Sequence, residues 1–161
     1  MAKNKEEKTN VMRVLEQKKI AYTAHTYPHE EGMAVDGVTV AKSMGFDPAI
    51  VFKTLVARGA SKQYYVFDVP VAENLDLKKA AKAVGEKSIE MIHQKELLPL
   101  TGYVHGGCSP VGMKKLFPTV FHETAENLET MIVSAGKIGY QVELAPHDLA
   151  ALVRAKFADI I

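Results

Sequence analysis

The sequence predicts an α+β fold in which a mixed, mainly antiparallel and partly barrel-like sheet is surrounded by helices. Most strand-like runs are joined by turns too short for a helical crossover, which favours antiparallel pairing. Segments with helical periodicity lie between and around these runs. No repeat, low-complexity tract or linker divides the 161 residues. We therefore expect a single domain over residues 1–161, in which residues 1–8 form a flexible charged leader.

Capping residues place the helices in the first half of the chain. A first helix begins at residues 9–10, and a second follows Gly37 and ends near Gly45. The third begins after Asp76 and ends at Gly85. Alternating and β-branched runs predict strands at residues 22–27, 50–58, 63–69 and 88–91, of which the middle two form a hairpin.

The second half of the chain predicts a helical turn, three more strands and a final helix. The helical turn covers residues 94–98. Pro146 suits the first position of the final helix, which we expect to continue to about Lys156. The strand-like runs lie at residues 119–122, 131–134 and 140–144.

Lys53 lies in the middle of a strand whose two faces are otherwise largely apolar. A lysine is seldom buried without a partner, because removing an ammonium from water costs several kcal/mol. Two interpretations stay open. The side chain extends so that its ammonium reaches the surface, or the ammonium is held in a pocket to meet an anion or a developing oxyanion.

A glycine-rich stretch at residues 101–112 is the second candidate site. Its glycines lack Cβ atoms, which frees backbone amides for close approach to a ligand. The stretch is neither a Walker loop nor a dinucleotide fingerprint. A tight turn and a binding loop are equally compatible with it.

The lone cysteine and the six histidines indicate neither a metal site nor a protein nucleophile. Cys108 lies three residues after His105, but thiolate chemistry needs a lowered pKa and a base within reach, so we interpret Cys108 as a packing residue. His25 and His29 would lie about 13 Å apart in a strand, too far to share a metal ion. We therefore expect no metal and no cofactor.

The charge and the composition restrict the partners. A formal net charge of +1 argues against strong electrostatic binding of nucleic acid by the chain alone. Lys78 and Lys82 share one face of the third helix, which is either a solvated face or a contact for phosphate. The sequence has no membrane-spanning run, no secretory signal and no second cysteine for an internal disulfide, which predicts a cytoplasmic protein with no membrane partner.

A series of short motifs occurs in order from about residue 10 to the C-terminus and resembles the YbaK/EbsC family of aminoacyl-tRNA editing proteins. Each motif alone is weakly specific, whereas the ordered set is specific. The motifs are HTY at 25–27, VFKTL at 51–55, LDLKKA at 75–80, TGY at 101–103, GGCSPVGMKK at 106–115, VSAGK at 133–137 and AKFADI at 155–160.

The resemblance implies an aminoacyl-tRNA deacylase, a hydrolase or lyase, that acts in trans on Cys-tRNA(Pro) or Cys-tRNA(Cys). Its implied partners are the acceptor end of tRNA(Pro) and prolyl-tRNA synthetase. In the mechanism implied, the substrate's own thiol attacks the ester carbonyl, and the tRNA leaves as a cyclic thiolactone forms. A protein without its own nucleophile then needs only to orient the thiol and stabilise the oxyanion.

The family's functional residues map onto individual positions of this sequence. The resemblance implies catalytic roles for Lys53, which anchors the acceptor end or the ester by charge, and for Gly106 and Gly107. These two glycines and Ser109 belong to the loop whose amides would face the carbonyl oxygen. The implied substrate-binding residues are Tyr27, Thr54, Tyr103, Ser109 and Ser134, of which the two tyrosines pack on the terminal adenosine.

Three positions depart from the family's pattern. An aromatic residue is usual at Asp36, glycine is usual at Ala135, and aspartate is common at Gln141. These departures leave the amino-acid specificity open. Two other functions therefore stay open as well: a deacylase for a tRNA carrying alanine or serine, and a non-catalytic module that binds tRNA or a synthetase.

Overall fold

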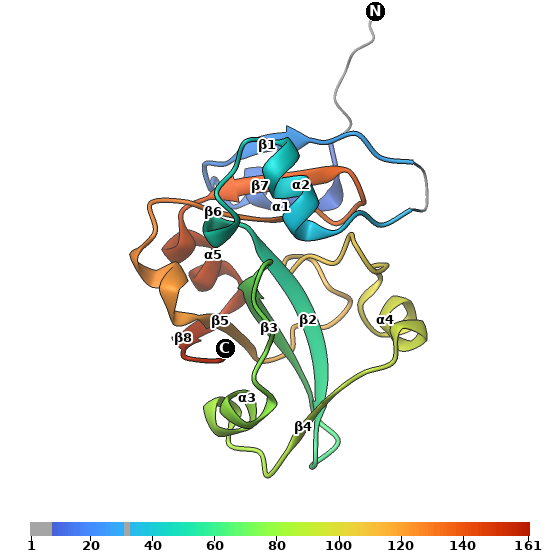
Figure 1. Cartoon of the computed structure of the whole chain (residues 1–161), viewed down its shortest axis with the longest axis vertical. Helices are drawn as coiled ribbons and strands as arrows, with labels where there is room; N and C mark the ends of the chain where they lie inside the picture. Colours follow the sequence, from blue (N-terminus) through green and yellow to red (C-terminus); the bar gives the residue numbers. More distant parts are fainter. Residues whose placement is uncertain (1–7, 31–32) are drawn as a thin grey trace, which may run out of the picture.

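The computed structural model describes residues 8–30 and 33–161. The predicted flexible leader thus falls outside the described residues, apart from Lys8, whose ammonium lies 2.9 Å from the Glu16 carboxylate. The described residues form two sheets, with strand orders β1-β7-β6 and β4-β2-β3-β5-β8. Figure 1 shows the small sheet with α1 and α2 at one end of the molecule and α3 at the other end, along the five-stranded sheet.

The bounds of the elements agree with most of the sequence predictions. The helices are α1 (Asn10–Gln17), α2 (Gly37–Ser43), α3 (Leu77–Val84), α4 (Gln94–Thr101) and α5 (Pro146–Val153). The strands are β1 (Thr23–Thr26), β2 (Phe52–Gly59), β3 (Tyr64–Pro70), β4 (Ile89–Met91), β5 (Thr119–His122), β6 (Met131–Ser134), β7 (Tyr140–Leu144) and β8 (Ala155–Ala158). Two short 3-10 helices cover Pro48–Ile50 and Glu123–Asn127.

The predicted α+β class and the predominance of antiparallel pairing are confirmed. Strands β2 and β3 form the predicted hairpin, and β2–β4, β1–β7 and β6–β7 also pair antiparallel. The pairs β3–β5 and β5–β8 are parallel. The two sheets meet where Val51 forms an isolated parallel bridge with Ile132, just before β2 begins.

The predicted continuation of the final helix to Lys156 is wrong. Helix α5 ends at Val153 because Arg154 adopts a left-handed conformation, with φ 57° and ψ 41°. The chain then turns into β8, where Phe157 pairs with Phe121 of β5 at a ring-centroid distance of 6.0 Å. No glycine marks this helix end, so the sequence carries no local signal for it.

Both faces of the five-stranded sheet are buried. One core cluster joins α1, the small sheet and α5 to one face of β2 and β3, and Leu15, Phe52 and Val142 belong to it. A second cluster lies on the opposite face beneath α3 and includes Phe67 and Ile160. Burial on both sides explains why β2 carries few polar residues.

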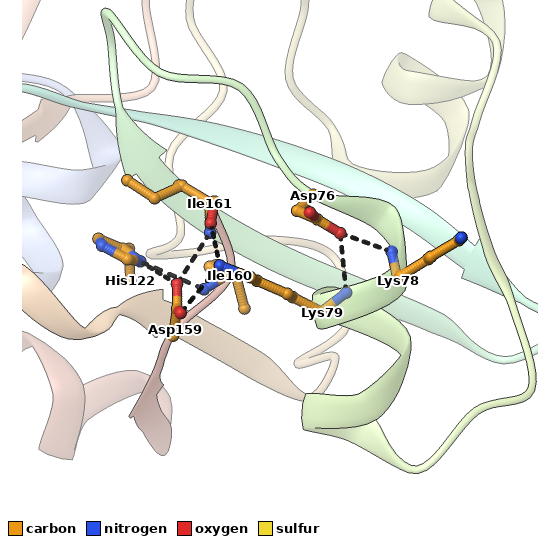
Figure 2. Close-up of polar contacts among 7 residues, drawn as sticks. All are labelled: Asp76, Lys78, Lys79, His122, Asp159, Ile160 and Ile161. Carbon is orange, nitrogen blue, oxygen red and sulfur yellow. Dashed lines mark hydrogen bonds and ion pairs between the residues drawn. The ribbon is translucent and has the colours of Figure 1, made fainter.

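Polar contacts fasten the C-terminal residues to α3. The Lys79 ammonium donates to Asp159 Oδ2 at 2.9 Å and to the Ile161 carbonyl at 2.7 Å (Figure 2). The amide of Asp76, the residue before α3, donates to the Ile160 carbonyl at 2.8 Å. Figure 2 also shows that Lys78 points away from this cluster. Lys79, although exposed, is therefore engaged by the C-terminal residues, whereas Lys78 of the same helix is not part of this cluster.

We predict that Ile160→Ala lowers the free energy of unfolding by about 2–5 kcal/mol, because it leaves a cavity at a fully buried position. Leu116→Ala is the control, since Leu116 is half exposed, and we expect a change within about 0.5 kcal/mol. Urea unfolding of the two variants and the wild type measures both effects. Equal losses in the two variants would show that the C-terminal segment does not contribute to the core.

Candidate functional site

A cavity of about 440 Å³ opens at the start of β2, where the two sheets meet. Five consecutive residues, 51–55, line it from both faces of the strand. Residues 34–37 line it from the beginning of α2, and His105, Gly106 and Cys108 line it from the glycine-rich loop. Ser134 at the end of β6 and Gln141 of β7 complete this part of the wall. The cavity therefore collects residues from distant parts of the sequence.

The structure places five of the predicted site residues at this cavity and three elsewhere. Tyr27, Lys53, Thr54, Gly106 and Ser134 line the cavity. Tyr103, Gly107 and Ser109 belong to the same glycine-rich region but do not line the cavity.

Tyr103 is a core residue rather than a wall of the cavity. It is 9% exposed, its ring belongs to the main core cluster, and its hydroxyl donates to the Val111 carbonyl. A Cβ added to Gly136 would lie 2.9 Å from the Tyr103 ring. Tyr103 therefore has no free face on which an adenosine could stack.

Gly107 and Ser109 determine the shape of the loop. The Gly107 amide donates to the Val104 carbonyl at 3.0 Å, so it is not free to face a substrate oxygen. A Cβ at Gly107 would lie 3.0 Å from the Ile138 nitrogen. Ser109 is fully buried, and its hydroxyl oxygen accepts from the Val111 amide at 3.2 Å.

In the glycine-rich loop, the lining residues whose amides lack a protein acceptor are Gly106 and Cys108, not the predicted pair Gly106 and Gly107. Both residues line the cavity, and neither N–H donates to any residue that the structure describes. Gly106 has φ +90°, and a Cβ there would lie 2.7 Å from Ala34 Cβ, so only glycine fits this approach. Two free amides close together in a loop are suited to bind an anion or a developing oxyanion.

Lys53 supplies positive charge to the cavity. Its side chain is partly buried, and no hydrogen bond or ion pair joins its ammonium to a residue within the described ranges. Asp36, the carboxylate among the described lining residues, accepts from the Thr39 amide and hydroxyl at 3.1 Å each and thereby caps α2. Lys53 therefore lies in the wall of the cavity, and its role there stays a prediction.

A buried carboxylic group lies behind the wall of the cavity. Asp68 of β3 faces Thr54 of β2 in register and is 0% exposed. The Thr54 hydroxyl donates to Asp68 Oδ1 at 2.5 Å, whereas Oδ2 has no partner among the described residues. Burial raises the pKa of Asp68 from 3.8 to about 7, and the hydrogen bond from Thr54 opposes this rise.

The sequence analysis missed Asp68. A carboxylic residue in the middle of the apolar run Tyr64–Pro70 was the available signal. Its partner Thr54 lies 14 positions earlier in the chain, so only the strand pairing brings the two together.

The thiol of Cys108 is unsuited to act as a nucleophile. Burial raises its pKa to about 12, and the neighbouring Asp68 carboxylate adds to the rise. At neutral pH the group is therefore a neutral thiol, which is a poor nucleophile. This geometry supports the interpretation of Cys108 as a packing residue.

Gln141 carries the second unpartnered buried atom of the described residues. The side chain is 7% exposed, it lines the cavity, and its Oε1 has no partner there. Gln141 pairs with Ser134 of β6, whose hydroxyl oxygen accepts from the Gly136 amide at 3.3 Å. Both unpartnered atoms, in Asp68 and Gln141, lie in or directly behind the cavity wall.

Comparison with known proteins identifies the family. The model of the aminoacyl-tRNA editing domain matches residues 29–152. The chain belongs to the aminoacyl-tRNA editing domain family. It is 46% identical over 161 residues to the Enterococcus faecalis (strain ATCC 700802 / V583) protein named "Putative Cys-tRNA(Pro)/Cys-tRNA(Cys) deacylase EbsC", and the match covers 99% of this chain and 98% of that relative.

Solved structures share the fold of this editing domain. A crystal structure described as "a putative trans-editing enzyme for prolyl tRNA synthetase" is 26% identical, with a TM-score of 0.77 and coverage of 93% of this chain and 95% of that chain. The hypothetical protein APE2540 is 18% identical with a TM-score of 0.81, covering 93% and 97% of the two chains, and shows the fold alone. The resemblance to the YbaK/EbsC family and the predicted fold are confirmed.

The three departures from the family's pattern have different surroundings in this editing domain. Asp36 and Gln141 line the cavity, so they change the groups in its wall. Ala135 is fully buried, and its amide donates to the Tyr140 carbonyl at 2.9 Å.

Within the described residues, no three His, Cys, Asp or Glu side chains converge as a metal site would need, and no helix is long and apolar enough to cross a bilayer.

We predict that Asp68 makes the stability of the editing domain depend on pH. Because its folded pKa of about 7 lies above the ordinary value of 3.8, the folded protein keeps a proton that the unfolded chain has lost. As the pH rises from about 4 to about 7, the free energy of unfolding should therefore fall by about 1.4 kcal/mol per pH unit. Above about pH 7 this group should cause no further fall.

Asp68→Asn removes this contribution. Its advantage in unfolding free energy over the wild type should grow between about pH 4 and pH 7 in urea titrations. His122, whose pKa burial lowers, is present in both proteins, so its contribution cancels in the difference. A difference that stays constant with pH would contradict the assignment.

Proposed function

We propose that this editing domain is a cytoplasmic, trans-acting deacylase that removes cysteine from Cys-tRNA(Pro). The observation that carries the proposal is that Lys53, Gly106 and Cys108 line one cavity, where the Lys53 ammonium and the two backbone amides have no partner among the described residues. These groups are donors for a carbonyl oxygen that becomes negative as an ester is attacked. The name of the 46% identical relative supports the same substrate.

The size and charge of the site support recognition of the acceptor end alone. A cavity of about 440 Å³ suits a small aminoacyl group and the adjoining ribose. The chain as a whole carries a net charge of +1, so it offers few uncompensated cations for the rest of a tRNA. We propose that prolyl-tRNA synthetase is the partner that holds the tRNA, as the description of the 26% identical structure suggests for that protein.

The proposed reaction uses the substrate's own thiol. The cysteinyl sulfur bonds to the ester carbonyl carbon, the bond from that carbon to the ribose oxygen breaks, and the thiol proton ends on the ribose oxygen. The products are free tRNA and a thiolactone, which water then opens. Lys53 and the two amides stabilise the intermediate oxyanion. The raised pKa of Cys108 supports this route, because the cavity's own thiol stays neutral.

The deciding experiment compares deacylation of Cys-tRNA(Pro), Ala-tRNA(Pro) and Pro-tRNA(Pro). We expect Cys-tRNA(Pro) to react about 100-fold faster than the other two, because alanine and proline have no thiol to attack the ester. Rapid hydrolysis of Ala-tRNA(Pro) would contradict thiol-assisted cyclisation and favour the broader deacylase. Turnover of none of the three above the uncatalysed rate would favour a non-catalytic binding module.

We predict that Lys53→Ala lowers kcat/KM for Cys-tRNA(Pro) by about 100-fold or more, because it removes a charged donor to the oxyanion. Lys42→Ala is the matched control, since Lys42 is an exposed lysine of α2 next to the cavity, and its kcat/KM should match the wild type. Full activity of the Lys53 variant in a single-turnover assay would overturn the role assigned to this residue.

A further inference from the structure

The hydroxyl of Thr54 has its one proton already committed. That proton points to Asp68 Oδ1, which lies 2.5 Å from the Thr54 oxygen. A hydroxyl has one donor and two acceptor lone pairs. Because Thr54 lines the cavity, the part of its hydroxyl that remains for a ligand is acceptor only.

Asp68 is fully buried in an apolar part of the core, so it does not contact the cavity directly. It lies on the same face of β3 as Val66, and that face packs in the main core with Phe52 and Val56 of β2. Its Oδ2 has no partner among the described residues. The thiol of Cys108 lies near enough for the Asp68 charge to raise its pKa. Oδ1 accepts from Thr54, and it can do so both in the ionised carboxylate and in a carboxyl group that carries its proton on Oδ2.

A second acceptor of the cavity is likewise without a donor. Gln141 Oε1 is buried, lines the cavity and has no partner among the residues described. The cavity therefore offers a cation and two amides for an oxyanion, and separately the acceptor oxygens of Thr54 and Gln141. An aminoacyl ester carries a matching donor, its α-ammonium, with three N–H groups.

We propose that Asp68 is a positioning residue that orients the Thr54 hydroxyl as an acceptor for the α-ammonium of the aminoacyl group. Asp68 acts through Thr54 and does not touch the substrate. This inference rests on the proposed function for its substrate class. It adds Asp68 to the site. It also assigns the hydrogen-bond acceptors of the cavity to the amino end of the substrate and the donors to its carbonyl end.

Binding of stable analogues tests the inference independently of turnover. The probe is adenosine carrying cysteine at its 3′ position through an amide bond in place of the ester. The comparison probe carries 3-mercaptopropionate instead, which keeps the thiol but lacks the α-amino group. A third probe, the cysteinyl analogue without the ribose 2′-hydroxyl, distinguishes the α-ammonium from that other donor. Calorimetry or a fluorescence competition assay gives the Kd values.

Four variants separate orientation from folding. Thr54→Val removes the hydroxyl, and Asp68→Val removes its acceptor while placing an apolar side chain in an apolar environment. Asp68→Asn is the conservative control, because an amide oxygen can still accept from Thr54. The double variant Thr54→Val with Asp68→Val tests whether the two residues act as a unit.

We expect Thr54→Val to weaken binding of the cysteinyl probe about 10-fold, and Asp68→Val about 5-fold. Asp68→Asn should stay within about 2-fold of the wild type, and the double variant should bind as Thr54→Val does. The mercaptopropionyl probe should bind all five proteins equally, and the 2′-deoxy probe should show the same losses as the cysteinyl probe.

The inference would be overturned by equal losses for the mercaptopropionyl probe, by losses that multiply in the double variant, or by no binding of the cysteinyl probe to the wild type. Losses confined to probes with a 2′-hydroxyl would assign the Thr54 acceptor to the ribose and also reject it. The probes could instead bind as predicted while the protein fails to deacylate Cys-tRNA(Pro). That result would reject the proposed function and leave the Asp68–Thr54 assignment intact.

Discussion

Burial of both faces of β2 is the constraint on which the rest of the structure depends. One face packs with α1, α5 and the small sheet, and the other packs beneath α3. A polar side chain in this strand must therefore find a buried partner or reach an opening. Thr54 finds Asp68, and Lys53 reaches the cavity at the start of the strand, where the two sheets meet. Burial of β2 on both faces thus accounts both for the core and for the position of Lys53 and Thr54 at the cavity.

The cavity separates charge stabilisation from nucleophilic attack. Its donors, the Lys53 ammonium and the amides of Gly106 and Cys108, are unpaired among the described residues. In contrast, the hydroxyls of Thr54 and Ser134 are hydrogen-bonded, and burial raises the pKa of the Cys108 thiol. Donors of this kind are suited to stabilise an oxyanion, and in the proposed mechanism the substrate supplies the attacking group. In the mechanism that we propose, a substrate that carries its own thiol supplies the attacking group, and this would give the site a physical reason to prefer cysteine.

Local signals account for the parts of the fold and site that the sequence predicts well. Asp76 caps α3 and Gly85 ends it in a left-handed conformation, as their residue types predict. Lys53 was recognisable because a charged residue interrupts an apolar strand. The end of α5 was not recognisable, because Arg154 takes a left-handed conformation that glycine usually adopts, and the pairing of β8 with β5 compensates for it.

The sequence by itself determined the fold class, the ordered motifs of the editing family and the position of Lys53, because each depends on neighbours within a few residues. Only the tertiary structure decided which residues meet at the cavity. It placed Tyr103 in the core, engaged the Gly107 amide with Val104 and set Asp68 behind Thr54. The physical reason is that hydrogen-bond partners and packing neighbours come from strands and loops distant in the chain. The donors left free for a substrate are those that no such neighbour has taken.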